Sequence, residues 1–189
     1  MITPNRLTFV RMAIAVSLPA LLLCHRSLLS EGIAIVAFTV ACVTDWWDGH
    51  LARTKLMVTT VGKIVDPIAD KALIIGCLLV FWIYGLFSIV WIILILIREI
   101  AVTFARLIRL IKGEVIPAEW AGKIKLGFQI GSVYSLFIFL LLADSAFPHT
   151  SFGPIGLSLS RALYFFALFI TNVITAFSGG LFFYRLMKP

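Results

Sequence analysis

The hydrophobic and polar positions of this chain are arranged in long blocks. Apolar stretches of roughly 20 residues, the length that a helix needs to cross a bilayer core, are separated by short polar connections. This pattern predicts an all-α protein, an integral membrane bundle of six transmembrane helices. The predicted spans cover residues 8–25, 31–50, 66–84, 86–108, 124–143 and 156–184.

The uncharged run over residues 72–97 decides how many spans are drawn. As one helix rising ~1.5 Å per residue it would overfill a hydrocarbon core about 30 Å thick, so we divide it by a hairpin at residues 84–85. With six spans and both termini on one side, 14 of the 16 Lys and Arg residues fall on that side, and only Arg26 and Arg161 fall on the other. The positive-inside rule then makes the basic side cytoplasmic.

Composition supports a membrane protein and restricts its partners. Hydrophobic residues make up 61% of the chain and charged residues 13%, with a mean hydropathy of +1.08, which is too apolar for a soluble domain of this size. We therefore expect residues 1–189 to form one membrane domain. The net charge of +7 favours anionic lipids or anionic substrates. No nucleic acid partner is expected, because no solvated face combines basic and aromatic residues.

The N-terminal segment is expected to remain on the protein. The apolar run after Arg6 and Arg11 lacks a small-residue cleavage site, so it predicts a first span rather than a signal peptide. Residues 2–12 also allow a short N-terminal interfacial helix before that span. The three cysteines, at positions 24, 42 and 77, lack C-x-x-C spacing and are interpreted as packing residues.

Four carboxylates stand where the second span ends and the third begins. Asp45 and Asp48 are three residues apart and Asp66 and Asp70 are four apart, so each pair shares one helix face. A short connection joins the two helices, and we expect the four acids to converge near the cytoplasmic membrane surface. Crowded carboxylates repel one another, and an all-oxygen ligand set suits hard divalent cations. The sequence therefore predicts two metal ions, Mg²⁺ or Mn²⁺.

Each of these acids also has a simpler interpretation when taken alone. Acids at helix ends are commonly solvated, and Asp66 before Pro67 is a suitable N-cap. The neighbouring residues favour a site instead. Gly49 and Gly62 leave room for a ligand near the backbone, and Arg53 is placed to reach a phosphate.

The complete spacing resembles the signature of the CDP-alcohol phosphotransferase family. The residues that carry the resemblance are Asp45-x2-Asp48-Gly49-x2-Ala52-Arg53-x8-Gly62-x3-Asp66-x3-Asp70. The resemblance implies transfer of a phosphatidyl or similar group from a CDP-linked donor to an alcohol, with release of CMP. It also implies a six-helix membrane fold, commonly a homodimer, with two divalent cations at the cytoplasmic surface.

The family pattern implies a role for each matching residue. The first three aspartates become metal ligands, and Asp70 becomes the base that deprotonates the acceptor hydroxyl as well as a contact of the second metal. The residues expected to bind the CDP-linked donor are Asn5, Thr8, Asp45, Gly49, Ala52, Arg53, Thr59 and Gly62. Thr8 also suits a helix-end cap, so its role stays open.

A second charged region suggests which alcohol accepts the group. Arg98 and Glu99 lie inside an otherwise apolar span, where ionisable side chains are usually functional or paired. A basic cluster there would suit an acceptor that carries phosphate. The candidate acceptor-phosphate residues are Arg98, Arg106, Arg109, Lys123 and Lys125. The positive-inside rule explains part of this cluster without a ligand, above all Arg109, Lys112 and Lys125.

Three short segments are similar to bacterial phosphatidylglycerophosphate synthases within this family: "PNRLTFVR", "RE" in the fourth span and "WAGKIK" before the fifth. This similarity implies CDP-diacylglycerol as donor and glycerol 3-phosphate as acceptor, in the bacterial cytoplasmic membrane. Inositol phosphate, or a lipid acceptor such as phosphatidylglycerol, remains an alternative.

Two further classes of protein are less compatible with the sequence. A divalent-cation transporter usually places its acids near the bilayer midplane on broken helices, whereas these four acids lie at one surface. A catalytically silent scaffold would have no need of a complete aspartate set.

Overall fold

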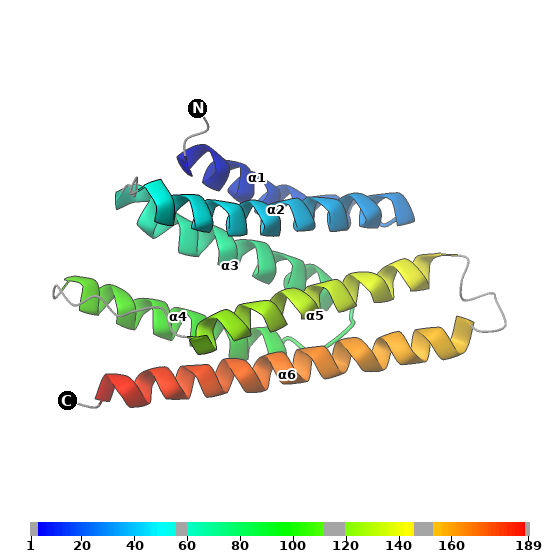
Figure 1. Ribbon diagram of the computed structural model, residues 1–189. Helices are drawn as coiled ribbons and strands as arrows, with labels where there is room; N and C mark the ends of the chain where they lie inside the picture. Colours follow the sequence, from blue (N-terminus) through cyan, green and yellow to red (C-terminus); the bar gives the residue numbers. More distant parts are fainter. Residues whose placement is uncertain (1–3, 56–59, 112–119, 146–152, 188–189) are drawn as a thin grey trace.

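The computed structural model describes residues 4–55, 60–111, 120–145 and 153–187, and within these ranges it contains helices and no strand (Figure 1). The predicted all-α class is confirmed for the described residues. Each predicted span overlaps one of six observed helices. These helices are α1 (Pro4–Cys24), α2 (Leu28–Lys55), α3 (Thr60–Ile83), α4 (Val90–Ile111), α5 (Trp120–Asp144) and α6 (Gly153–Met187).

The start of α1 corrects one expectation. Residues 4–12 belong to a single continuous helix with the rest of α1, so the separate N-terminal interfacial helix is not observed in the described residues. Pro4 stands at the first position of this helix, where its missing N–H costs no hydrogen bond.

Local sequence signals set two helix ends in the first half of the chain. Ser27 caps α2 in a reciprocal arrangement, because the backbone N–H of Ser30 donates to Ser27 Oγ at 3.2 Å and the N–H of Ser27 donates to Ser30 Oγ at 3.0 Å. The end of α3 is a Schellman motif, in which Leu86 N–H donates to the Phe81 carbonyl at 3.2 Å. Gly85 supplies the left-handed residue at φ 75°. The predicted hairpin at residues 84–85 is confirmed.

The helices run up and down, so their termini gather at two ends of the bundle (Figure 1). We call the aspartate end the one where α1, α3 and α5 begin and α2, α4 and α6 finish; the opposite end is the far end. α1 packs against both α2 and α3, α5 contacts the same two helices, and α6 lies along α5 and α4. Both ends of the described chain lie at the aspartate end.

The core lies where α5 meets α2 and α3. The Phe137 ring of α5 meets Phe81 of α3 edge-on, with centroids 5.0 Å apart, and lies 6.0 Å from Phe38 of α2. All three side chains are fully buried. α1 approaches α3 closely, because a Cβ at Gly76 would lie 3.0 Å from the ring of Pro19. These contacts fix the first three helices around one apolar centre.

The outer surface of the bundle is suited to lipid rather than water. Large apolar side chains such as Val16, Phe166 and Phe177 are more than 60% exposed. Three described helices, α2, α5 and α6, are long and apolar enough to cross a bilayer by length and composition. Such continuous exposed apolar surface is characteristic of an integral membrane protein.

Candidate functional site

The helix that carries the first aspartate pair, α2, finishes at the aspartate end, and the helix that carries the second pair, α3, begins there. Asp45 and Asp48 lie in the last turns of α2, and Asp66 and Asp70 lie in the first turns of α3. The predicted helical spacing within each pair is therefore confirmed. The side chains of residues 46–70 lie outside the described ones, so Asp45 is the one acid of the four whose contacts are described.

Asp45 is held by a buried arginine of α1. Arg11 Nη1 lies 3.0 Å from Asp45 Oδ1, and the Arg11 side chain is 2% exposed, whereas Asp45 is 36% exposed. A buried cation is costly unless it faces an anion, so this ion pair fixes the end of α2 against α1. The Asp45 carboxylate remains partly exposed. Sequence reasoning counted Arg11 only as a basic residue near the N-terminus and missed this contact.

A metal site can be judged here only from the chemistry of its donors. Among the side chains that the structure describes, no group of three or more His, Cys, Asp and Glu residues could hold a metal ion. Asp48, Asp66 and Asp70 are not among those described side chains. The donor set remains consistent with a hard cation, because it consists of carboxylates and its described member, Asp45, is partly exposed and oriented by Arg11.

The other predicted donor-binding residues also lie outside the described side chains. Thr59 falls in a segment that is not described at all. The remaining ones occupy helical positions in α1, α2 and α3, namely Asn5, Thr8, Gly49, Ala52, Arg53 and Gly62.

A second charged group is centred on Glu99, near the middle of α4. Its carboxylate is 6% exposed, and cations of three helices contact it. Lys125 Nζ of α5 donates to Oε1, Arg98 Nη1 lies 3.4 Å from the same oxygen, and Lys71 Nζ of α3 lies 3.8 Å from Oε2. We call Glu99 and these three cations the Glu99 cluster. Two of the predicted acceptor residues, Arg98 and Lys125, are brought together in it.

Arg98 is also fixed from the side of α6. Its Nη2 donates to Ser178 Oγ at 2.7 Å. The neighbouring Gly179 allows the close approach, since a Cβ there would lie 2.9 Å from Arg98 Cγ. The guanidinium is therefore positioned by a hydroxyl of α6 on one side and by Glu99 on the other.

The remaining predicted acceptor residues have other described contacts. Arg106 lies over the Phe182 ring of α6 at 5.5 Å, and Arg109 Nη2 donates to the Leu186 carbonyl at 3.1 Å. Lys123 lies over the ring of Trp120 on its own helix at 5.4 Å. These contacts place all three near the aspartate end but do not join them to the Glu99 cluster.

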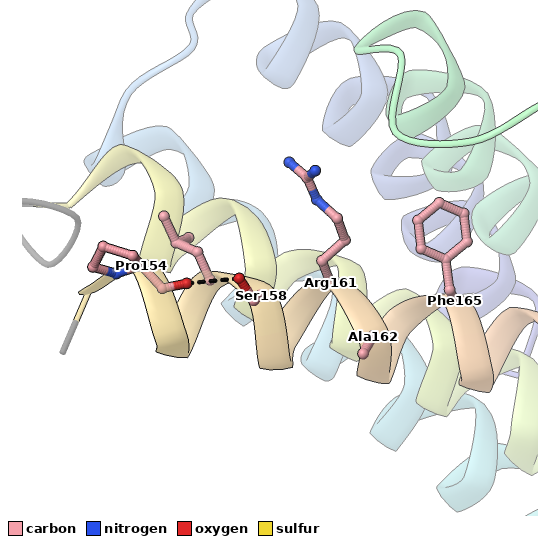
Figure 2. Close-up of a pocket in the computed structure, with 6 residues that line it drawn as sticks. Pro154, Ser158, Arg161, Ala162 and Phe165 are labelled. Atoms are coloured by element: carbon pink, nitrogen blue, oxygen red, sulfur yellow. Dashed lines mark hydrogen bonds between the residues drawn. The ribbon is translucent and has the colours of Figure 1, made fainter.

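A cavity at the far end has a different lining from the aspartate signature and the Glu99 cluster. It has a volume of about 450 Å³ and lies along one side of α6 near its start (Figure 2). Its lining is mainly apolar and includes Arg161, whose guanidinium lies 5.7 Å from the centre of the Phe139 ring. Ser158 Oγ is occupied by a hydrogen bond to the Pro154 carbonyl at 2.8 Å. With no carboxylate among its lining residues, this cavity is not the candidate active site.

The geometry can be compared with known proteins. Residues 1–178 match the family model described as CDP-alcohol phosphatidyltransferase, and this chain belongs to that family. It is thus a member of a family of transferases of phospholipid biosynthesis.

Three curated relatives illustrate the similarity within the family. The CDP-diacylglycerol–glycerol-3-phosphate 3-phosphatidyltransferase of Bacillus subtilis is 39% identical over 130 residues, which are 69% of this chain and 65% of that protein. A probable phosphatidylglycerophosphate synthase of Mycobacterium tuberculosis is 46% identical over 95 residues, 49% of this chain and 44% of the relative. A Cereibacter sphaeroides protein with the first of these names is 31% identical over 139 residues, covering 71% and 62%. The alignments cover less than two thirds of each relative's own length.

Proposed function

We propose that this chain transfers a phosphatidyl group from CDP-diacylglycerol to glycerol 3-phosphate, giving phosphatidylglycerophosphate and CMP. The observation that carries the proposal is that two features share helix α3. The complete aspartate signature lies on α2 and α3, and the Glu99 cluster lies among α3, α4 and α5. The names of relatives at 31–39% identity agree with this reaction.

Two divalent cations, Mg²⁺ or Mn²⁺, would be held by the four aspartates of the signature. When bound, they neutralise the pyrophosphate of the donor and stabilise the charge on the departing CMP. Arg11 of α1 orients the Asp45 carboxylate of α2, so this ligand would need little reorganisation when the site fills. Gly49 would leave room for the nucleotide, and Arg53 would contact its phosphates.

Asp70 would serve as the base. It accepts the proton of the acceptor hydroxyl, whose oxygen then forms the new bond to phosphorus while the bond to CMP breaks. Its place in the first turns of α3 puts it directly before Lys71, which belongs to the Glu99 cluster. The base and the group that would hold the acceptor phosphate are thus adjacent in one helix.

The acceptor phosphate would be held by the basic residues of α4 and α5. Glycerol 3-phosphate carries a phosphate that needs charged hydrogen-bond donors. The Glu99 cluster brings together Arg98, whose side chain is 12% exposed, and the buried Lys125. Arg106, Arg109 and Lys123 would act at its margin. An acceptor without phosphate would have little use for this charge.

We place the protein in the bacterial cytoplasmic membrane as six spans. The helix ends that the sequence pattern predicts to be cytoplasmic, by the positive-inside rule, are those at the aspartate end, which supports a cytoplasmic site with both termini on that side. A water-soluble acceptor and a lipid donor would then meet at one surface. Residues 1–189 would form one domain, and two such chains would associate as a homodimer.

The test is CMP release from CDP-diacylglycerol by purified protein, with acceptors supplied one at a time. Glycerol 3-phosphate is expected to give the highest turnover. Equal or greater turnover with inositol phosphate or phosphatidylglycerol would overturn the acceptor assignment. Divalent-cation uptake into proteoliposomes without CMP release would overturn the transferase assignment and favour a carrier.

A further inference from the structure

Glu99 lies where three helices contribute cations to one buried site. It is the only acid of α4, and its two carboxylate oxygens contact different cations. Oε1 faces Lys125 and Arg98, and Oε2 faces Lys71. Removing this carboxylate would therefore take one contact away from side chains of α3, α4 and α5 together.

Lys71 has a second anchor on the same helix. Its Nζ donates to Thr103 Oγ1, and Thr103 lies one turn after Glu99 on α4. Two groups on one face of α4 thus hold the ammonium group of α3. The Lys71 side chain is 29% exposed, which leaves part of it accessible to a ligand.

The charges of the cluster are suited to an added anion. Among the described side chains, three cations contact a single carboxylate, and three of the four members are at most 12% exposed. A phosphate group accepts charged hydrogen bonds from several cations at once, and these three are already held close together by Glu99. Lys71 is placed to take part, because it shares the carboxylate with two residues already assigned to the acceptor.

We infer that Glu99 is a positioning residue for the acceptor-phosphate site and that Lys71 is a further member of that site. Glu99 would not touch the substrate. It would hold Lys71, Arg98 and Lys125 at the spacing that a phosphate needs, and Lys71 would connect the bound phosphate to the turn of α3 that carries Asp70. This inference rests on the proposed function for the identity of the acceptor.

Simple electrostatics makes the opposite prediction, which allows a sharp test. A carboxylate near the phosphate repels it, so neutralising Glu99 would strengthen acceptor binding if charge alone mattered. If position matters, the Glu99→Gln substitution frees the lysines and leaves Lys125 buried without its anion, and binding weakens. A lower KM for the acceptor would indicate the purely electrostatic effect of Glu99, and a higher KM would indicate its positioning effect.

The experiment measures KM for glycerol 3-phosphate and for CDP-diacylglycerol separately, in the full-length protein. Glu99→Gln is expected to raise KM for glycerol 3-phosphate about tenfold or more, the loss typical of charged hydrogen bonds. Its KM for the donor should change by less than about twofold, and kcat at saturating acceptor should be largely retained. Lys71→Met, at a partly exposed position, should show the same selective effect and remains informative if Glu99→Gln does not fold.

Asp144→Asn is the matched control, because it removes a carboxylate paired with a cation at the far end. It should leave both KM values unchanged. An unchanged or lower acceptor KM in Glu99→Gln, or equal changes in both KM values, would overturn the positioning role. An unchanged acceptor KM in Lys71→Met would remove Lys71 from the site. Failure of the proposed function is seen separately, as wild-type protein that does not transfer to glycerol 3-phosphate.

Discussion

Two groups of side chains in the bundle, one at the far end and one around Glu99, both bury charge, but they balance it differently. At the far end, Arg26 donates two hydrogen bonds of 2.9 Å to Asp144, and Glu31 lies fully buried beside that carboxylate. In the Glu99 cluster, three cations contact the single carboxylate of Glu99. The far-end group thus has two acids for one cation among the described side chains, and the Glu99 cluster has three cations for one acid. The excess of cations is what an anionic substrate would use.

The charged side chains at the far end join the segments that link the helices there. Arg26 lies in the link between α1 and α2, Asp144 is the last residue of α5, and the guanidinium also covers the Tyr84 ring at 5.0 Å, after the end of α3. The hydrogen bonds from Arg26 to Asp144 raise the pKa of the guanidinium above its ordinary value, so it stays charged. We interpret this group as structural. Substitutions there should change stability, whereas substitutions at the aspartate end should change chemistry.

The largest expected effect is at Asp70. Asp70→Asn keeps the shape of the side chain but cannot accept the proton of the acceptor hydroxyl, and loss of a general base costs roughly 10²- to 10⁴-fold in rate. CMP release at saturating substrates is the measurement. The far-end Asp144→Asn variant, which removes the same charge, should keep wild-type turnover. Full activity in Asp70→Asn would eliminate it as the base.

The second largest effect is expected at the ion pair between Arg11 and Asp45. Arg11→Met removes the cation that orients this carboxylate, and loss of such a supporting contact typically weakens metal binding about 10- to 100-fold. The concentration of Mg²⁺ or Mn²⁺ that gives half-maximal CMP release should rise accordingly. Arg11→Lys keeps a positive charge, so its half-maximal metal concentration should lie between those of the wild type and Arg11→Met. An unchanged metal requirement in Arg11→Met would make the ion pair purely structural.

Asp70 and Arg11 also show how much of the site could be predicted from the sequence. The placement of Asp66 and Asp70 on one helix could be predicted, because residues four apart on a helix share a face. The role of Asp70 as the base stays a prediction that rests on the fixed spacings of the signature. The hairpin at residues 84–85 could be predicted because a longer helix would not fit the bilayer. Local rules of this kind also gave the approximate limits of the six helices.

Contacts between helices could not be predicted in the same way. Arg11 meets Asp45 because α1 packs along α2, and Lys71 meets Glu99 because α3 approaches α4. Neither relation has a spacing that could be recognised in one sequence. The positive-inside rule also obscured the signal, since a basic residue on that side needs no ligand to explain it.

A smaller effect is expected in the far-end hairpin. Gly85 adopts φ 75°, and a Cβ there would meet no atom within 4 Å, so the cost of Gly85→Ala comes from the backbone conformation alone. This cost is about 1 kcal/mol of stability. Gly32→Ala, in the helical interior of α2 and equally free of steric contact, should instead stabilise the protein slightly. Thermal unfolding in detergent should give opposite signs for the two variants, with CMP release unchanged in both.

The smallest effect is expected for Asp144→Asn, despite the good geometry of its pair with Arg26. The Arg26 side chain is 47% exposed, so solvent screens the attraction, and pairs of this kind contribute about 1 kcal/mol or less. Loss of the Asp144 charge also removes its repulsion of the buried Glu31, which offsets part of that cost. Thermal unfolding in detergent should therefore show a small decrease, and the difference from wild type should shrink at high salt.

The same variant tests the division between the two ends. If the far end is structural, Asp144→Asn lowers stability slightly and leaves the KM for glycerol 3-phosphate unchanged. A several-fold fall in CMP release would show instead that the link between α1 and α2 controls the position of α1, and through Arg11 that of Asp45. Double substitution with Arg11→Met distinguishes these cases, because effects on independent sites add, whereas effects transmitted along α1 do not.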